Sequence, residues 1–339
     1  MHDVVSEPDG ASVAAAPAAE LLAAPALTTR PALAPTVSVV ICAYTEERWG
    51  RLVAAVESAR RQTLPPLEVL VVVDHNSRLL ARVRRELGGT KALANSEAAG
   101  LSGARNSGVA AASGDVVAFL DDDAAAHPDW IARLLPHYAD STVLGVGGTI
   151  ETDWVEGRPP GFPPELDWIV GCTYRGVPDS VAPVRNLIGA NMSVRRDVLE
   201  TVGGFRCGIG RTGAVPVGCE ETELCIRARR DVGGEFVFEP AARVSHAVPP
   251  DRATWRYFRS RCFSEGVSKA QVASAAGSRD ALATERAYTL RTLPAGVLRG
   301  LGDAIRGDVS GAVRAAAIIA GLLVTATGYG VGVLRQARA

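Results

Sequence analysis

The chain has 339 residues, a formal net charge of -1 and a sequence pI near 6.5. It is long enough for one large domain or two modest ones, and its charge offers no bulk attraction to nucleic acid. No stripe of Lys and Arg with interleaved aromatic residues occurs, so we expect no nucleic-acid partner. The six cysteines form neither a Cys-x-x-Cys pair nor a Cys/His cluster with zinc spacing, which is typical of a reduced, cytosolic setting.

Residues 1–34 are rich in Ala and Pro, and this composition predicts a disordered tail. From residue 36 apolar runs alternate with segments of helical spacing. Strands are expected at 37–44, 67–73, 91–95 and 116–120, and helices near 52–59, 79–87 and 100–108. This alternation predicts an α/β fold with a mostly parallel central sheet.

The ends of these strands carry polar side chains. Tyr44, Asp74 and Asp121 stand where three of the strands end. Because ligands of open α/β sheets bind beyond the carboxyl ends of the strands, we expect the three residues to line one crevice.

The second half of the chain is less regular. Prolines and glycines dominate residues 153–185, and a long irregular stretch of this kind is typical of a functional loop. Regular structure is expected to return at 186–194, with helices at 195–202 and 220–229 and strands at 236–238 and 242–245. Beyond residue 251 the pattern predicts helices.

Three consecutive aspartates, Asp121, Asp122 and Asp123, follow the buried strand at 116–120. Their mutual repulsion and lost hydration cost several kcal/mol unless a cation offsets them, and a hard divalent metal is the usual partner. The alternative is an acidic turn that caps the next helix. Pro128 suits the first position of that helix, however, so the aspartates come too early to cap it.

A segment at 315–334 contains no charged residue and is about long enough to cross a bilayer. We interpret it as a candidate membrane helix, with a helix buried against the domain or lying in the interface as the alternative. Arginines are more frequent before this segment than after it. That bias predicts that the large N-terminal domain lies in the cytoplasm, at the cytoplasmic face of the cell membrane.

Taken together, these motifs resemble the family 2 glycosyltransferases with the GT-A fold, of the inverting, non-processive bacterial type, over residues 36–246. Residues 39–46 (VVICAYTE) resemble the family's first strand and nucleotide-contacting turn, which implies donor contacts from Ala43, Tyr44 and Glu46. Asp74 is similar to the aspartate that receives the base of the nucleotide. Arg105, in Gly-Ala-Arg-Asn-Ser-Gly, is similar to the arginine beside the donor.

The aspartates fit the same resemblance. Residues 119–123 (FLDDD) resemble the family's metal motif, which implies Asp121 and Asp123 as metal ligands and Asp121 and Asp122 as donor contacts. His246 is similar to a histidine that ligates the metal in some members. The implied cofactor is Mg²⁺ or Mn²⁺.

The acceptor side is implied by two further motifs. Asn191, in Asn-Met-Ser, resembles the acceptor-side segment, together with Gly-Gly-Phe at 203–205. Residues 219–224 (CEETEL) are similar to the pair that ends in the catalytic base. The resemblance implies that Glu220 lies on the acceptor side of the site. It also implies that Glu221, which stands where the family has an aspartate, is the catalytic base.

Some of these residues have competing structural interpretations. Asp74 could cap the following helix, and Arg105 could be a solvated helix residue. Glu220 and Glu221 could be favourable charges at a helix start. His246 could be a structural histidine.

The resemblance implies a metal-dependent inverting transfer of a sugar from a UDP- or GDP-sugar to a glycan or polyprenyl-linked acceptor in envelope biosynthesis. The Gln-x-x-Arg-Trp motif of processive synthases is absent from the sequence. The expected organisation is a GT-A domain at 36–250, with a nucleotide-binding half at 36–123 and an acceptor half at 124–250, then helices at 251–314 and the candidate membrane helix. Two alternatives are open: a membrane-tethered, non-catalytic nucleotide-sugar or glycan binder, and a metal-dependent phosphohydrolase that would use the same aspartates.

Overall fold

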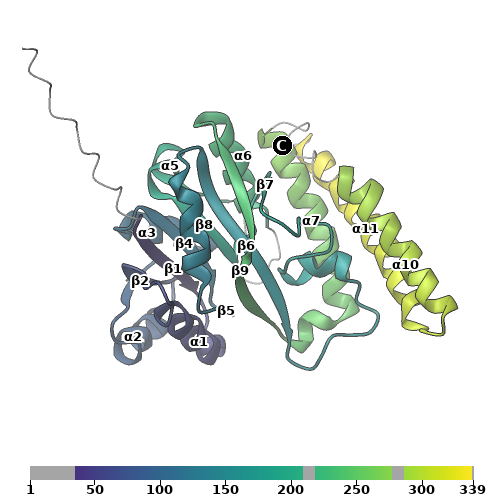
Figure 1. Cartoon of the computed structure of the whole chain (residues 1–339), viewed down its shortest axis with the longest axis horizontal. Coiled ribbons are helices and arrows are strands. Elements are labelled where there is room, and N and C mark those ends of the chain that lie inside the picture. The colour runs from purple at the N-terminus through teal and green to yellow at the C-terminus, as the bar shows by residue number, and fades with distance from the viewer. Residues whose placement is uncertain (1–34, 209–217, 277–285, 338–339) are drawn as a thin grey trace, which may run out of the picture. The chain divides into compact units, whose positions relative to one another are not determined.

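The computed structural model describes residues 35–208, 218–276 and 286–337. The tail predicted at 1–34 lies outside these residues. Within them, the chain forms a nine-stranded mixed sheet in the order β3-β2-β1-β4-β8-β6-β9-β5, and β7 pairs with β9 (Figure 1). The strands are β1 Val37–Ala43, β2 Glu68–Val73, β3 Lys91–Ala94, β4 Val116–Asp121, β5 Ala124–Ala126, β6 Val143–Trp154, β7 Ala182–Val184, β8 Asn191–Arg195 and β9 Glu235–Val248.

The first four strands are parallel, as predicted, and their carboxyl ends meet at one edge. β8 then runs antiparallel to β4 and to β6, whereas β6 and β9 form a long parallel pair. The helices are α1 Trp49–Arg60, α2 Ser77–Glu86, α3 Leu101–Ala111, α4 Trp130–Leu134, α5 Arg196–Thr201, α6 Glu220–Asp231, α7 Trp255–Ala276, α10 Leu293–Ile305 and α11 Ser310–Gln336. The result is an α/β fold of the GT-A kind, with helices after the sheet.

Alternate residues of β1 enter two different cores, because successive side chains of a strand point to opposite faces. Val39 and Ile41 pack in one core with residues of α1 and α2. Val40 packs in the other core with residues of α3, α5 and α6. The sheet is therefore covered on both sides at β1, which explains why both faces of this strand carry buried apolar side chains.

Several segments differ from the sequence prediction. The two strands expected at 236–238 and 242–245 are one strand, β9, and β7 forms inside the stretch that was expected to be irregular. The helix expected at Pro128 begins at Trp130, because residues 124–126 first form the short strand β5 against β9. β6 was not predicted, since its glycines hide the strand pattern. A Cβ atom on Gly148 would lie 1.8 Å from the carbonyl oxygen of Ala242 on β9. The close approach of β6 and β9 at this position therefore leaves room only for glycine.

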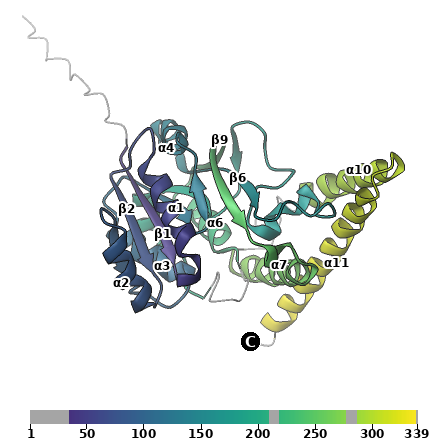
Figure 2. The same ribbon diagram turned by 90° about the horizontal axis from the view of Figure 1, so that it is seen from below.

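The C-terminal helices pack on the rest of the domain. A short 3₁₀ helix, η3 Pro164–Val170, shares the first core with α7 and α11. α11 lies along α7 and beside α10 (Figures 1 and 2). Cβ atoms on Gly266 of α7 and Gly328 of α11 would each lie 2.1 Å from a backbone oxygen of the facing helix. α11 is long and apolar enough to cross a membrane, yet it is in close contact with the domain.

Candidate functional site

A crevice opens at the carboxyl ends of β1, β2 and β4, where the start of α6 and the end of η3 complete its wall. The parallel register of β1 and β4 sets Cys42 beside Asp121, which brings the first strand to the aspartates. Ten of the predicted site residues line this crevice: Ala43, Tyr44, Asp74, Arg105, Asp121, Asp122, Asp123, Glu220, Glu221 and His246.

Asp74 holds the turn that follows β3. Its carboxylate accepts hydrogen bonds from the backbone N–H of Gly100 at 2.9 Å and from Nδ2 of Asn95 at 2.7 Å. The cap of α2 is Asn76, whose side chain accepts from the backbone N–H of Leu79. The helix-capping interpretation of Asp74 is therefore wrong, and its carboxylate faces the crevice.

Asp121, Asp123 and His246 form a candidate metal site. One ligand atom from each lies within 4.8 Å of the other two, and Nε2 of His246 lies 3.0 Å from Oδ1 of Asp123. β5 pairs with β9 so that Ala124 is opposite His246, and this antiparallel register carries the histidine to the aspartates. The two carboxylates suit Mg²⁺ or Mn²⁺, and an imidazole is a ligand that transition metals accept more readily than Mg²⁺. On its other side, Nδ1 of His246 lies 3.7 Å from the thiol of Cys172.

Two arginines that the sequence did not single out face the same aspartates. Arg48 lies 3.0 Å from Asp122 and 3.2 Å from Asp123, and Arg252 lies 3.2 Å from Asp123. Burial and the charge of Asp123 raise the pKa of Asp122 to about 7, against the opposing effect of Arg48. Burial alone would also raise the pKa of Asp123, but His246, Arg252 and Arg48 hold it below its ordinary value. Arg48 lies only a few residues after β1 in the sequence. The sequence alone does not show that its side chain points to the aspartates, because they follow a different strand.

Arg105 is buried, with 2% of its surface exposed. Its Nη1 donates to Oε1 of Glu220 at 2.9 Å, and its guanidinium lies 5.8 Å and 5.3 Å from the ring centroids of Phe119 and Phe205. Burial opposes its charge, but Glu220 and Asp121 outweigh that effect and raise the pKa of Arg105. The interpretation of Arg105 as a solvated helix residue is wrong.

Glu221 has the chemistry of a proton acceptor. Burial, followed by the nearby charge of Glu220, raises its pKa from 4.5 to about 8. Among the described residues, three buried carboxylate oxygens have no hydrogen-bond partner, and all belong to this crevice: Oδ2 of Asp122, Oε2 of Glu220 and Oε2 of Glu221. Buried polar atoms without a partner are rare and costly, so these oxygens indicate a site that a ligand completes.

The backbone before these glutamates is strained. Cys219, the N-cap of α6, has a φ of 76°, in the left-handed region. Its thiol lies 3.6 Å from Oε1 of Glu265 on α7, and Ser268 of α7 accepts a hydrogen bond from the N–H of Gly218. α7 therefore supports the turn that directs Glu221.

Two predicted site residues do not line the crevice. Glu46 lies in the 3₁₀ turn η1 Glu46–Arg48, where its carboxylate is 3.9 Å from Arg78. Asn191 is 1% exposed. Its amide accepts from Nε1 of Trp130 and donates to the carbonyl oxygens of residues 149 and 242. In this conformation Asn191 joins three strands and contacts no open space.

The chain matches the model of the family "Glycosyl transferase family 2" over residues 38–203. It is 39% identical over 237 residues to the glucosyl-dolichyl phosphate glucuronosyltransferase of Haloferax volcanii, a match that covers 69% of this chain and 76% of that protein. Glycosyltransferase AglE of the same organism is 30% identical over 178 residues, which cover 50% of this chain and 56% of AglE.

Solved structures show the same fold. The mannosyltransferase PcManGT from Pyrobaculum calidifontis, in complex with GDP-Man and Mn²⁺, aligns with a TM-score of 0.55 and 19% identity. That alignment covers 87% of this chain and 88% of PcManGT. Family match, relatives and fold agree: the chain is a glycosyltransferase that belongs to glycosyl transferase family 2.

Proposed function

We propose that the chain is a metal-dependent, inverting and non-processive glycosyltransferase that moves a sugar from a UDP- or GDP-sugar to a hydroxyl of a lipid-linked glycan. One observation carries the proposal: the cluster of Asp121, Asp123 and His246 shares a crevice with the buried and unpartnered Oε2 of Glu221. The donor diphosphate needs a metal site, and the acceptor hydroxyl needs a proton acceptor close to that site.

Glu221 is the proposed base. In an inverting transfer the acceptor oxygen attacks the anomeric carbon from the face opposite the diphosphate, and its proton passes to Oε2 of Glu221. A pKa of about 8 keeps this carboxylate poised near neutral pH, where a general base is efficient. The ion pair of Glu220 with Arg105 would orient the start of α6.

Asp74 and Tyr44 are the proposed contacts of the nucleoside, from the β2 and β1 side of the crevice. Asp121, Asp123 and His246 are the residues that would hold Mg²⁺ or Mn²⁺. Such an ion supplies positive charge against the negative charge that gathers on the leaving diphosphate. The donor set and the unpartnered oxygen of Asp122 suit a divalent cation.

The acceptor proposal follows from the relatives and from α11. A relative that covers 69% of this chain is named for glucosyl-dolichyl phosphate, a lipid-linked sugar. We therefore propose a polyprenyl-linked acceptor at the cytoplasmic face of the membrane. The exposed apolar side chains of α10 and α11 would contact the lipid. The domain limits at 36–250, 251–314 and 315–334 stay part of the proposal.

A donor screen tests this function. Thermal shift with Mn²⁺ and a panel of nucleotide sugars should single out one nucleotide, and the same sugar should then pass to a polyprenyl-phosphate glycan. Release of the nucleoside diphosphate must need both the acceptor and the metal. Cleavage of phosphoesters without an acceptor would instead identify a phosphohydrolase, and donor binding without turnover would identify a non-catalytic binder.

A further inference from the structure

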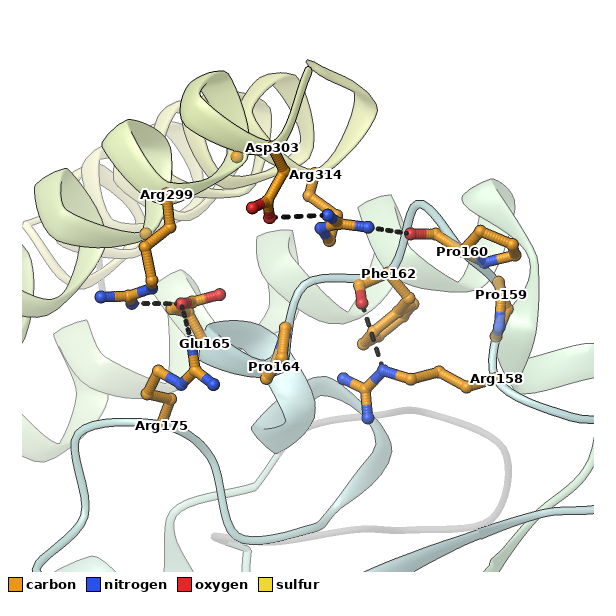
Figure 3. Close-up of a pocket in the computed structure, with 12 residues that line it drawn as sticks. Arg158, Pro159, Pro160, Phe162, Pro164, Glu165, Arg175, Arg299, Asp303 and Arg314 are labelled. Carbon is orange, nitrogen blue, oxygen red and sulfur yellow. Dashed lines mark hydrogen bonds and ion pairs between the residues drawn. The ribbon is translucent and has the colours of Figure 1, made fainter. Parts of the chain in front are cut away.

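Two clusters of arginines and carboxylates in this structure differ in how their charges are matched. The first lines a pocket of about 330 Å³ between the loop before η3 and the helices α10 and α11 (Figure 3). Its four arginines face four carboxylates, with Arg158 on Asp167, Arg175 and Arg299 on Glu165, and Arg314 on Asp303 and Asp308. These charges balance, so the pairs join the loop to the helices and need no ligand.

The second cluster lies in the crevice, where several groups share Asp123. Its Oδ2 lies 3.2 Å from both Arg48 and Arg252, and its Oδ1 lies 3.0 Å from Nε2 of His246. A metal ion in the candidate site would add two positive charges beside a carboxylate that two guanidinium groups already share. Like charges repel each other at such short range, so we expect one guanidinium to move away when the metal binds.

Arg48 is the arginine that can move more easily. Its side chain lines the crevice and is 22% exposed, whereas the side chain of Arg252, in the 3₁₀ turn η4 Pro250–Ala253, is 7% exposed. The contact of Arg48 with Asp122 also leaves that carboxylate incomplete, because its Oδ2 is buried without a partner. Moving Arg48 therefore gives up less buried contact than moving Arg252.

Arg48 lies between the two groups of residues that would hold a nucleotide sugar. Its guanidinium lies 5.4 Å from the ring centroid of Tyr44, a proposed contact of the nucleoside, and 3.0 Å from Asp122, next to the candidate metal ligands. In a nucleotide sugar the diphosphate follows the nucleoside and is the part that a metal binds. A guanidinium offers parallel N–H donors that match the oxygens of a phosphate group. The position of Arg48 therefore suits a contact with the diphosphate.

We propose that Arg48 is a donor-binding residue that exchanges one partner for another. Without a metal, Arg48 neutralises Asp122 and Asp123. When the metal binds the aspartates, the guanidinium is released and contacts the diphosphate of the donor. The identity of this ligand rests on the proposed function, whereas the competition between Arg48 and the metal does not. The alternative is a permanent ion pair that keeps the aspartates in place for both the metal and the nucleotide.

Two calorimetric titrations of Arg48→Gln test the exchange, because the two affinities should change in opposite directions. Mn²⁺ alone should bind roughly tenfold more tightly, since no guanidinium competes for the aspartates. At saturating Mn²⁺, UDP or GDP, whichever the parent chain binds, should bind roughly tenfold more weakly, as expected for a lost charge-assisted hydrogen bond. Arg51→Gln is the matched control, because Arg51 is a partly buried arginine of α1 that does not line the crevice.

A second variant, Arg48→Lys, keeps the charge but lacks the parallel donors. Its Mn²⁺ affinity should stay near that of the parent, and its nucleotide affinity should fall only about threefold. Melting temperatures in chelator show whether Arg48→Gln folds, and Arg48→Lys carries the test if it does not. Nucleotide affinity equal to that of the parent in Arg48→Lys would then overturn the inference.

Loss of both affinities in Arg48→Gln would also overturn the inference, since that result would identify a permanent ion pair. Unchanged nucleotide affinity in Arg48→Gln, or an equal loss in Arg51→Gln, would contradict the contact with the diphosphate. The proposed function fails in a different way. Opposite changes of the two affinities in a chain that transfers no sugar would reject the proposed function and keep the exchange at Arg48.

Discussion

The crevice and the C-terminal helices differ in whether their polar side chains have partners. In the crevice, Asp122, Glu220 and Glu221 each have a buried oxygen without a partner among the described residues. Around α10 and α11, arginines and carboxylates are paired, and glycines allow the backbones of α7 and α11 to touch. The crevice is thus arranged for a ligand at a cost in stability, whereas the helices stabilise the fold. Substitutions should separate these two effects.

The largest effect is expected for Glu221→Gln. Loss of a correctly positioned base should slow transfer by roughly 10²–10⁴-fold, with donor affinity unchanged. Above a pH of about 8, where Glu221 is ionised, the same substitution removes a buried charge with an unpartnered oxygen, so it should stabilise the fold there by about 1–3 kcal/mol. Steady-state kinetics and urea unfolding measure the two effects.

A matched variant lies two residues away. Both carboxylate oxygens of Glu223 face arginines, and Arg227 lies 2.8 Å from one of them. Glu223→Gln should therefore destabilise the fold, by about 3–5 kcal/mol for a broken buried pair. If Glu221→Gln also destabilised it, the idea that the crevice opposes folding would be wrong.

Asp121→Asn should weaken Mn²⁺-dependent donor binding by roughly a hundredfold, because one charge of the candidate metal site is lost. The side chain of Asp121 is 32% exposed, so stability should change little. Glu47→Gln is the control, since Glu47 is an exposed acid that follows the same first strand. Calorimetry with and without chelator measures the change. Equal donor affinity in both variants would exclude Asp121 as a ligand.

Transfer should rise with pH by about tenfold per unit below the pKa of Glu221 and level off above about 8. Only the deprotonated carboxylate accepts a proton, which fixes this sign. Stability should move in the opposite direction. The folded chain holds this proton up to a pH of about 8, whereas the unfolded chain releases it near 4.5, so this contribution falls as the pH rises between the two values. Glu221→Gln should lose this contribution of Glu221 in both profiles and keep the pH dependence that the other titratable groups cause.

The smallest effect belongs to the helices. Gly328→Ala forces a Cβ atom against the carbonyl oxygen of Phe263 and should cost about 1–3 kcal/mol. A Cβ atom on Gly330 meets nothing within 4 Å, so Gly330→Ala should stabilise the fold by about 0.5–1 kcal/mol. Urea midpoints at constant slope measure both values, and donor affinity should not change in either variant. Equal stabilities would mean that the α7–α11 contact is loose.

The sequence predicted the parallel half of the fold because period, strand ends and apolar runs are local signals. It also predicted Asp121, Asp123 and His246 as one group, through the resemblance of their motifs, and the structure brings them together. Arg48 and Arg252 escaped prediction because their partners are distant in the chain. Only the pairing of β9 with β5 and the turn after it bring Arg252 to Asp123.

β6 escaped prediction for the opposite reason. Gly145, Gly147 and Gly148 remove the side chains by which a strand is recognised, although close approach of β8 and β9 demands them. Asn191 shows a third limit. A polar residue in such a motif can bind the sugar acceptor or can join strands of the sheet. The hydrogen bonds of Asn191 show that it joins strands.

The left-handed turn at Cys219 determines how far this enzyme can be shortened. A non-glycine residue in that conformation costs roughly 1–2 kcal/mol, so neighbouring contacts must hold it. Those contacts come from Glu265 and Ser268, on a helix that begins after the last strand of the sheet. A truncated chain that ends with the sheet would retain Asp74 and the aspartates but would lose the support that aims Glu221. It should bind sugar nucleotides and turn them over poorly.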